Sequence, residues 1–112
     1  MPDDSLTQTH CQPCHDGACR LDREQVDALL TRLSGWRLAG SAAIEKEFTF
    51  TSYPATMAFV NTIAWLAERE DHHPDLEVGY NRVTVRFSTH TVDGLSRNDF
   101  ICAAKIDALV RI

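Results

Sequence analysis

Four features that mark specialised classes of protein are missing from this sequence. No apolar run approaches the roughly 20 residues that a membrane-spanning helix needs, and the chain has neither an internal repeat nor a low-complexity linker. Basic residues are in the minority, with 11 Lys and Arg against 16 Asp and Glu and a net charge of −5. A chain with this net negative charge lacks the excess of basic residues that is typical of nucleic-acid-binding proteins. We therefore expect no membrane and no nucleic acid as a partner.

The N-terminus also lacks the pattern of a secretory signal peptide, because MPDDSLTQTH is polar and acidic. We accordingly expect a cytoplasmic protein whose four cysteines are thiols rather than disulfides. What the chain does contain is ordinary for a globular protein, since 44% of its 112 residues are hydrophobic. This is enough for one domain with one core.

Residues 1–20 differ from the rest of the chain, because they are polar, rich in Cys and His, and without a hydrophobic period. The first helix is predicted directly after them. Asp22 and Gln25 have the spacing of a capping box, and apolar residues then repeat at helical spacing as far as Leu33. Ser34-Gly35 predicts its end. We therefore divide the chain into a Cys/His-containing extension, residues 1–20, and a folded domain, residues 21–112.

Strand and helix patterns alternate through the rest of the chain. Short strands are predicted at residues 36–38 and 44–50, and a helix from about Ser52 to about Glu70. A hairpin over residues 76–78 and 83–87 follows. The last helix is predicted to begin after Ser96, with Asp99 as its capping acid and an apolar face made of Cys102, Ala103, Ile106, Leu109 and Val110. The order α-β-β-α-β-β-α predicts an α+β fold, in which helices pack on one face of a four-stranded antiparallel sheet.

The stretch from Glu68 to His90 contains three of the chain's five histidines, and four carboxylates, Glu68, Glu70, Asp71 and Asp75, lie around the pair His72-His73. Glu68, Glu70 and Asp71 lie at the C-terminal end of a predicted helix, where the helix dipole disfavours negative charge. A local rule broken this often indicates function. These carboxylates favour protonation of the adjacent imidazoles, His72 and His73.

The geometry of the pair supports a ligand site. Pro74 biases His73 toward an extended backbone, on which neighbouring side chains point in different directions. Two plainer interpretations compete with this one. A histidine pair at a helix end is often solvated surface, and a run of carboxylates is often a solubilising face. A metal site is a third interpretation, since imidazole and carboxylate are metal ligands, but no helical H-x-x-x-H spacing supports it.

The same residues carry a resemblance to a known family. The chain resembles the pterin-4a-carbinolamine dehydratases over residues 21–112, through Glu68, Asp71-His72-His73-Pro74, Tyr80, Ser88-Thr89-His90, Gly94-Leu95-Ser96 and Asp99. The resemblance implies a hydro-lyase that dehydrates 4a-hydroxytetrahydrobiopterin to the quinonoid dihydropterin, in tetrahydrobiopterin recycling after aromatic amino acid hydroxylation. It implies no metal and no organic cofactor, because the pterin is the substrate.

The resemblance also implies roles for individual residues. His72, His73 and His90 match the family's active-site histidines, with His72 expected mainly to position the substrate and the other two to transfer protons. Four further side chains are expected to bind substrate or shape the pocket: Glu68, Asp71, Asp99 and Trp36. Three residues also have a plain structural interpretation. Trp36 could pack in the core, Tyr80 could pack as an aromatic on the hairpin, and Asp99 could cap the last helix. A homodimer or homotetramer and a functional link to an aromatic amino acid hydroxylase follow from the family.

The N-terminal extension departs from the minimal family pattern. It contains His10, Cys11, Cys14, His15 and Cys19, and the C-x-x-C spacing of Cys11 and Cys14 is that of a metal or redox site. A zinc site, a redox-active thiol pair and an unstructured tail stay open here, and a strong zinc signal would need a second paired knuckle. We expect the domain to fold without residues 1–20. Cys102 is predicted to lie in the core.

Alternative functions remain within the same fold. Family members elsewhere act as dimerisation partners, or coactivators, of a transcription factor, and related carboxysome proteins act as rubisco assembly factors. Such non-catalytic relatives tend to lose the histidine set, which is intact here. The same chemistry could also serve molybdenum-cofactor metabolism, and a histidine-carboxylate metal protein is the remaining class.

Overall fold

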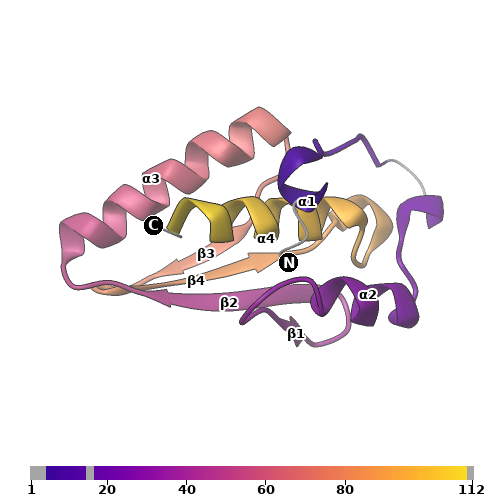
Figure 1. Cartoon of the computed structure of the whole chain (residues 1–112), viewed down its shortest axis with the longest axis horizontal. Helices are drawn as coiled ribbons and strands as arrows, with labels where there is room; N and C mark the ends of the chain where they lie inside the picture. Colours follow the sequence, from indigo (N-terminus) through magenta and orange to yellow (C-terminus); the bar gives the residue numbers. More distant parts are fainter. Residues whose placement is uncertain (1–4, 15–16, 111–112) are drawn as a thin grey trace.

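The computed structural model describes residues 5–14 and 17–110 (Figure 1). Its elements in chain order are α1 (Ser5–Gln8), the 3-10 turn η1 (Gly17–Cys19), α2 (Arg23–Leu30), β1 (Arg37–Ala39), β2 (Ala43–Thr49), α3 (Tyr53–Glu70), β3 (Asp75–Val78), β4 (Arg82–Phe87), the 3-10 turn η2 (His90–Val92) and α4 (Arg97–Val110). Within these described residues, no helix combines the length and the apolar character that crossing a membrane would require.

The four strands form one antiparallel sheet in the order β1-β2-β4-β3. Figure 1 shows α3 and α4 on the same side of this sheet. The predicted α+β class is confirmed, and so is the α-β-β-α-β-β-α order over residues 21–110, to which the structure adds α1 and the two 3-10 turns.

Alternation along the two central strands explains which face of the sheet is covered. On β4, Val83, Val85 and Phe87 are at most 1% exposed, while the residues between them are not buried. On β2, Ile44 lies opposite Phe87 and Phe48 lies opposite Val83. These apolar side chains therefore line one face, against which the helices pack as the core.

The other face of the sheet is polar and held by charge. Glu45 on β2 accepts hydrogen bonds from Arg86 on β4, at 3.0 Å from Nε, and from Arg37 on β1, at 2.7 Å from Nη2. The hydrogen bond from Arg86 is the largest influence on the pKa of Glu45. Together with Arg37 it outweighs burial and holds that pKa below its usual range.

The predicted helix starts are confirmed. Asp22 and Gln25 form a reciprocal capping box on α2, and the Ser52 side chain accepts from the Ala55 amide at the start of α3. The end of α2 comes earlier than predicted. Its regular turns stop at Leu30 because the following residues form tighter turns, such as the bond from the Leu33 amide to the Leu30 carbonyl.

The last helix, α4, is buried around most of its circumference because two layers cover it. The sheet lies on one side, and α1 lies beside it on another (Figure 1). Leu6 of α1 is 1% exposed and belongs to the core, and the Lys105 ammonium on α4 donates to the Thr7 carbonyl at 2.9 Å. The predicted apolar face of α4 is buried except at Leu109 and Val110, which are 43% and 38% exposed, so the prediction is wrong for these two residues.

The interpretation of the extension as an unstructured tail is therefore wrong for its described part. We call residues 5–14 the N-terminal strap. The last strap residue, Cys14, forms a disulfide with Cys19, with Cα atoms 5.9 Å apart, so the expectation of four thiols is wrong at these two positions. The chain then runs against η2. The Leu21 amide donates to the Leu95 carbonyl at 2.8 Å, and a Cβ on Gly94 would meet Arg20 at 2.9 Å.

We predict that Leu6→Ala lowers the free energy of unfolding by roughly 2–5 kcal/mol, the cost typical of truncating a buried leucine. Urea unfolding followed by circular dichroism measures it. The matched control is Leu109→Ala on α4, which removes the same atoms from an exposed site and should cost no more than about 0.5 kcal/mol. Equal effects of the two changes would show that the strap does not contribute to the core.

We predict that Glu45→Gln destabilises the protein at neutral pH and that the loss shrinks on acidification. The folded pKa of Glu45 is depressed, so its carboxylate contributes stability above the usual value of 4.5, and that contribution is lost as the pH falls through the lower folded value. Urea unfolding of both proteins across this range tests it. A difference in stability that is constant with pH would contradict the prediction, and exposed Glu47→Gln is the control.

Candidate functional site

The turn after α3 separates the two neighbouring histidines. Asp71 ends the helix in the left-handed conformation, with φ 51°, and both its amide and that of His72 donate to the Ala67 carbonyl. A left-handed residue at this position reverses the direction of the chain. As a result the His72 side chain is 12% exposed, whereas the His73 side chain is 59% exposed.

His72 is held from two directions. Its ring stacks on Phe87 at the end of β4, with the ring centres 5.7 Å apart and the planes within 6° of each other. Its Nε2 lies 2.6 Å from Oδ1 of Asp99, which is fully buried in the first turn of α4. Because an ionised carboxylate only accepts, Nε2 carries the proton and Nδ1 is left as the nitrogen that can exchange one.

The Asp99 carboxylate is satisfied by donors from three segments. Besides His72, its Oδ2 accepts from the Thr89 hydroxyl at 2.8 Å and from the Ser96 amide at 2.9 Å. The Thr89 hydroxyl has one proton and gives it to Asp99, so its 2.7 Å contact with Ser96 Oγ must be a bond that Ser96 donates. The start of α4 also favours an acid there. The ring of His72 is therefore held in one orientation.

The other two histidines are accessible. His73 Nε2 lies 3.6 Å from Glu68 Oε1, and both side chains are mostly exposed, so this pair constrains the imidazole little. His90 begins η2 and is exposed. The loop that carries it is closed by a bond from the Thr89 amide to the Gly94 carbonyl. Both rings can exchange protons with a ligand or with solvent.

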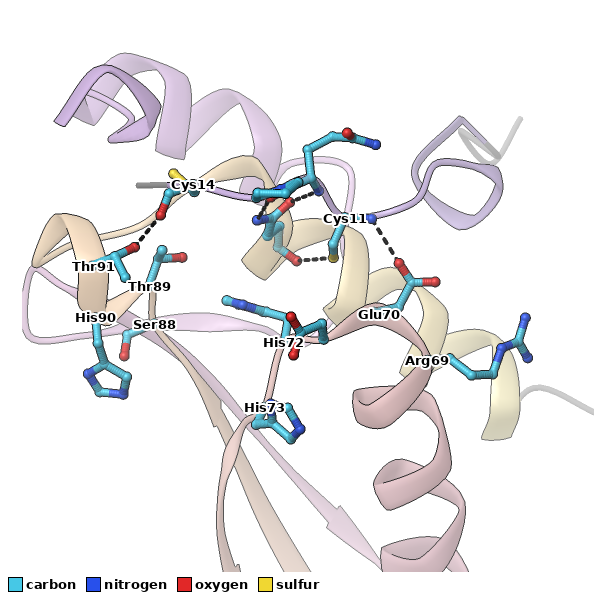
Figure 2. Close-up of a pocket in the computed structure, with 14 residues that line it drawn as sticks. Cys11, Cys14, Arg69, Glu70, His72, His73, Ser88, Thr89, His90 and Thr91 are labelled. Atoms are coloured by element: carbon cyan, nitrogen blue, oxygen red, sulfur yellow. Dashed lines mark hydrogen bonds between the residues drawn. The ribbon is translucent and has the colours of Figure 1, made fainter. Parts of the chain in front are cut away.

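All three histidines line one cavity of about 550 Å³ (Figure 2). This volume suits a small ligand with one or two rings. In Figure 2 the end of the strap runs across the top of the site, His72 and His73 lie below it, and His90 lies to one side. The lining residues are Cys11, Gln12, Pro13, Cys14, Arg69, Glu70, Asp71, His72, His73, Ser88, Thr89, His90, Thr91 and Asn98.

The other predicted site residues lie at different depths. Asp71 lines the cavity. Asp99 lies behind two lining residues, His72 and Thr89, and it also accepts from the Ser96 amide, so it combines its two expected roles as site acid and helix cap. Glu68 is outside the lining and pairs with His73. Trp36 is in the core, in contact with Phe48 and Phe87, and its indole N–H donates to Asp107 at 3.0 Å. Tyr80 is 63% exposed, so its interpretation as a packed aromatic is wrong.

Several lining residues were not predicted. Thr89 belongs to the Ser88-Thr89-His90 motif that carries the family resemblance, although no role was predicted for it. Thr91 follows His90 and Asn98 adjoins Asp99, so proximity to a predicted residue was the signal available for these two. Gln12 and Pro13 lie between Cys11 and Cys14, the candidate metal or redox residues, but nothing in the sequence placed that segment beside the histidines. They reach the cavity only because the strap crosses α4, where Asn98 and Gln12 exchange two hydrogen bonds of 3.0 and 2.7 Å.

Glu70 is the second buried acid at this cavity, with a side chain 2% exposed. Burial acts to raise the pKa of Glu70. The Cys11 amide at 2.8 Å, His10 at 2.9 Å and the ammonium of Lys105 at 3.7 Å outweigh burial and hold that pKa below its usual range. This carboxylate is therefore charged, and the strap supplies two of its three partners.

The cysteines of the described residues do not gather around a common point. Cys11 lies with its Sγ 3.5 Å from that of Cys102, which is buried as predicted, and hydrogen bonding with Cys11 together with burial raises the pKa of the Cys102 thiol. Among residues 5–14 and 17–110 there is no group of three or more His, Cys, Asp or Glu side chains placed to hold a metal ion. His15, one of the candidate ligands, lies outside the described residues.

The cavity is equipped for proton transfer to and from a small polar molecule. One imidazole has a fixed orientation and two are accessible, and the ring nitrogens of an imidazole can donate or accept a hydrogen bond. Arg69 and the amides and hydroxyls of the lining can hold polar edges of a ligand.

Comparison with known proteins agrees with this arrangement. A family model described as pterin 4 alpha carbinolamine dehydratase matches residues 19–109. A protein of Nitrosospira multiformis, provisionally named pterin-4-alpha-carbinolamine dehydratase, is 50% identical over 109 residues, which cover 97% of this chain and 96% of that protein.

Two solved structures are also similar. A transcriptional coactivator/pterin dehydratase from Brucella melitensis has a TM-score of 0.78 at 33% identity, covering 82% of this chain and 99% of that one. A pterin dehydratase-like protein identified as a rubisco assembly factor in the alpha-carboxysome has a TM-score of 0.59 at 31% identity, covering 67% of this chain and 88% of that one. By its sequence, its fold and its histidine-lined cavity, this chain belongs to the pterin-4a-carbinolamine dehydratase family.

Proposed function

We propose that this protein is a hydro-lyase that dehydrates 4a-hydroxytetrahydropterins to the quinonoid dihydropterin. The observation that carries the proposal is the cavity in which the buried His72–Asp99 pair lies together with two accessible imidazoles. We also propose 4a-hydroxytetrahydrobiopterin as the substrate, with the product returning to an aromatic amino acid hydroxylase in the cytoplasm.

The chemistry needs two proton transfers. The C4a–O bond breaks and the hydroxyl leaves as water, so it must receive a proton, and N5 must lose one as the C4a=N5 double bond forms. Positioned imidazoles perform both steps without a metal. Because His72 is locked by Asp99 and Phe87, we assign it to positioning the pterin at its hydroxyl. We assign the proton transfers to His73 and His90, whose exposure allows them to be recharged by solvent.

A second candidate function is an interaction role without catalysis. The names of the two similar structures favour it, since one mentions a transcriptional coactivator and the other a rubisco assembly factor. The three histidines around one cavity argue for catalysis, because an interaction surface does not require two accessible imidazoles beside a cavity sized for a small ligand. Activity measurements on the isolated protein separate the two candidates.

We also propose a homodimer or homotetramer. Two features of the described chain support assembly. The sheet has free edges at β1 and β3, and edge strands need covering. Trp65 on α3 is 74% exposed and Val78 at the β3 edge is 45% exposed. Analytical ultracentrifugation measures the state directly, and a monomer at micromolar concentration would contradict it.

We predict that the purified protein, dialysed against a chelator, accelerates the dehydration of a 4a-hydroxytetrahydropterin generated in situ. Loss of the carbinolamine absorbance measures the rate. Restoring zinc or magnesium should leave the rate unchanged, because the proposed proton transfers need only imidazoles. A rate no faster than the spontaneous reaction would remove the enzymatic proposal in favour of an interaction role.

We predict unequal effects of replacing the three histidines. General acid–base catalysis is worth roughly 10²–10⁴-fold, so His73→Ala and His90→Ala should each lower kcat toward the lower part of that range, since the other imidazole or water substitutes in part. The double variant should lose most of the acceleration. His72→Ala should mainly raise KM. Steady-state kinetics on variants that remain folded by circular dichroism test this.

Glu47→Ala is the control for these variants, because Glu47 is an exposed titratable side chain outside the cavity lining. It should leave kcat within about twofold of the unmodified protein, the range expected where no acid–base group is removed. A folded His73→Ala/His90→Ala protein that works at the unmodified rate would refute the assigned roles.

A further inference from the structure

The end of the N-terminal strap forms part of the cavity that the histidines line. Four consecutive strap residues, Cys11 to Cys14, belong to the lining. They face a site whose chemistry comes from α3, β4 and η2, which are all remote in sequence. The strap also lies outside the residues that the family model matches, which begin at residue 19. The family match therefore gives the strap no role.

The strap is fastened along its length rather than loosely laid over the surface. Lys105 holds the Thr7 carbonyl, Asn98 holds both the amide and the carbonyl of Gln12, and the Thr91 hydroxyl donates to the Cys14 carbonyl. All of these bonds involve backbone atoms of the strap, so they fix the path of its main chain. Figure 2 shows the bonds from Cys11 to Glu70 and from Thr91 to Cys14 at the two ends of this lining segment.

Glu70 is the central fastening, and it explains the acid at the end of α3. A carboxylate buried at a helix C-terminus is costly unless it has donors. Its donors here are the Cys11 amide and His10, both in the strap, with Lys105 close by. Glu70 is also two residues from His72. The short segment at the end of α3 therefore holds both the strap, through Glu70, and the imidazole of His72.

We propose that the N-terminal strap is a wall of the substrate pocket that presses the pterin against the histidines, and that Glu70 is the positioning residue that holds this wall in place. The inference rests on the proposed function in that its ligand is a pterin. The strap itself transfers no proton. It acts on binding, so losing its fastening weakens affinity more than it slows chemistry.

The test compares full-length Glu70→Ala with Glu70→Gln. The alanine variant has no acceptor for the Cys11 amide, whereas the glutamine variant keeps a carbonyl oxygen there. Removing a hydrogen bond to a charged group is worth about tenfold or more in an equilibrium constant. We expect Glu70→Ala to weaken binding of 7,8-dihydrobiopterin about tenfold, with kcat within about threefold, and Glu70→Gln to restore most of the affinity. Exposed Glu47→Ala is the matched control and should change neither value.

Two measurements keep the outcomes separate. Hydrogen exchange of the Cys11 and Gln12 amides reports the strap, and should rise in Glu70→Ala but not in Glu47→Ala, at a temperature where both are folded. Titration with 7,8-dihydrobiopterin, a stable reduced pterin, reports binding without catalysis. If the unmodified protein binds it but does not dehydrate the carbinolamine, the proposed activity fails while the strap is still tested by the variants.

Two results would overturn the inference. One is a Glu70→Ala protein whose strap amides exchange faster yet whose affinity for the pterin is unchanged, because the strap would then be a cover for α4 and not a pocket wall. The other is a Glu70→Ala protein whose affinity for the pterin falls although its strap amides exchange as slowly as in the unmodified protein, because Glu70 would then act on binding without holding the strap.

Discussion

The site depends on one buried charge. The Asp99 carboxylate is fully buried in the first turn of α4 and accepts from His72, Thr89 and the Ser96 amide. An ionised carboxylate in a protein interior is strongly destabilising unless such donors surround it. These donors come from the end of α3, the end of β4 and the start of α4. The three segments can therefore meet in only a narrow range of arrangements, and the orientation of His72 follows from the same requirement.

A second buried carboxylate, that of Glu70, also holds separate segments together through its hydrogen-bond donors. Glu70 draws the strap onto the end of α3, just as Asp99 draws together the elements below it. The strap in turn covers α4, whose residues from Phe100 to Ala104 are all nearly inaccessible. Packing and pocket formation are thus coupled, because the segment that completes the core with Leu6 also supplies one wall of the cavity.

The sheet serves this site as a rigid base. Its covered face supplies Phe87, on which His72 stacks, and its open face is held by Arg37, Glu45 and Arg86 across three strands. The reactive groups themselves lie where elements end, at the turn after α3 and the loop after β4. Backbone at such ends is free of the regular ladder, so a side chain there can be aimed at a ligand while its neighbours stay fixed.

Local patterns in the sequence determined most of the fold, and the family resemblance pointed to the three histidines that line the cavity. Capping residues such as Asp22 and Ser52 and the alternation around Val83 to Phe87 act within a few residues, so they can be interpreted without the tertiary structure. Only the tertiary structure decided that Asp99 faces His72 while Glu68 stays outside, since a left-handed turn at Asp71 sets those directions. It also decided that the strap closes the cavity. The partners of the strap lie about 60 to 100 residues away, as with Cys11 and Glu70 or Thr7 and Lys105, and no local pattern encodes a contact across that separation.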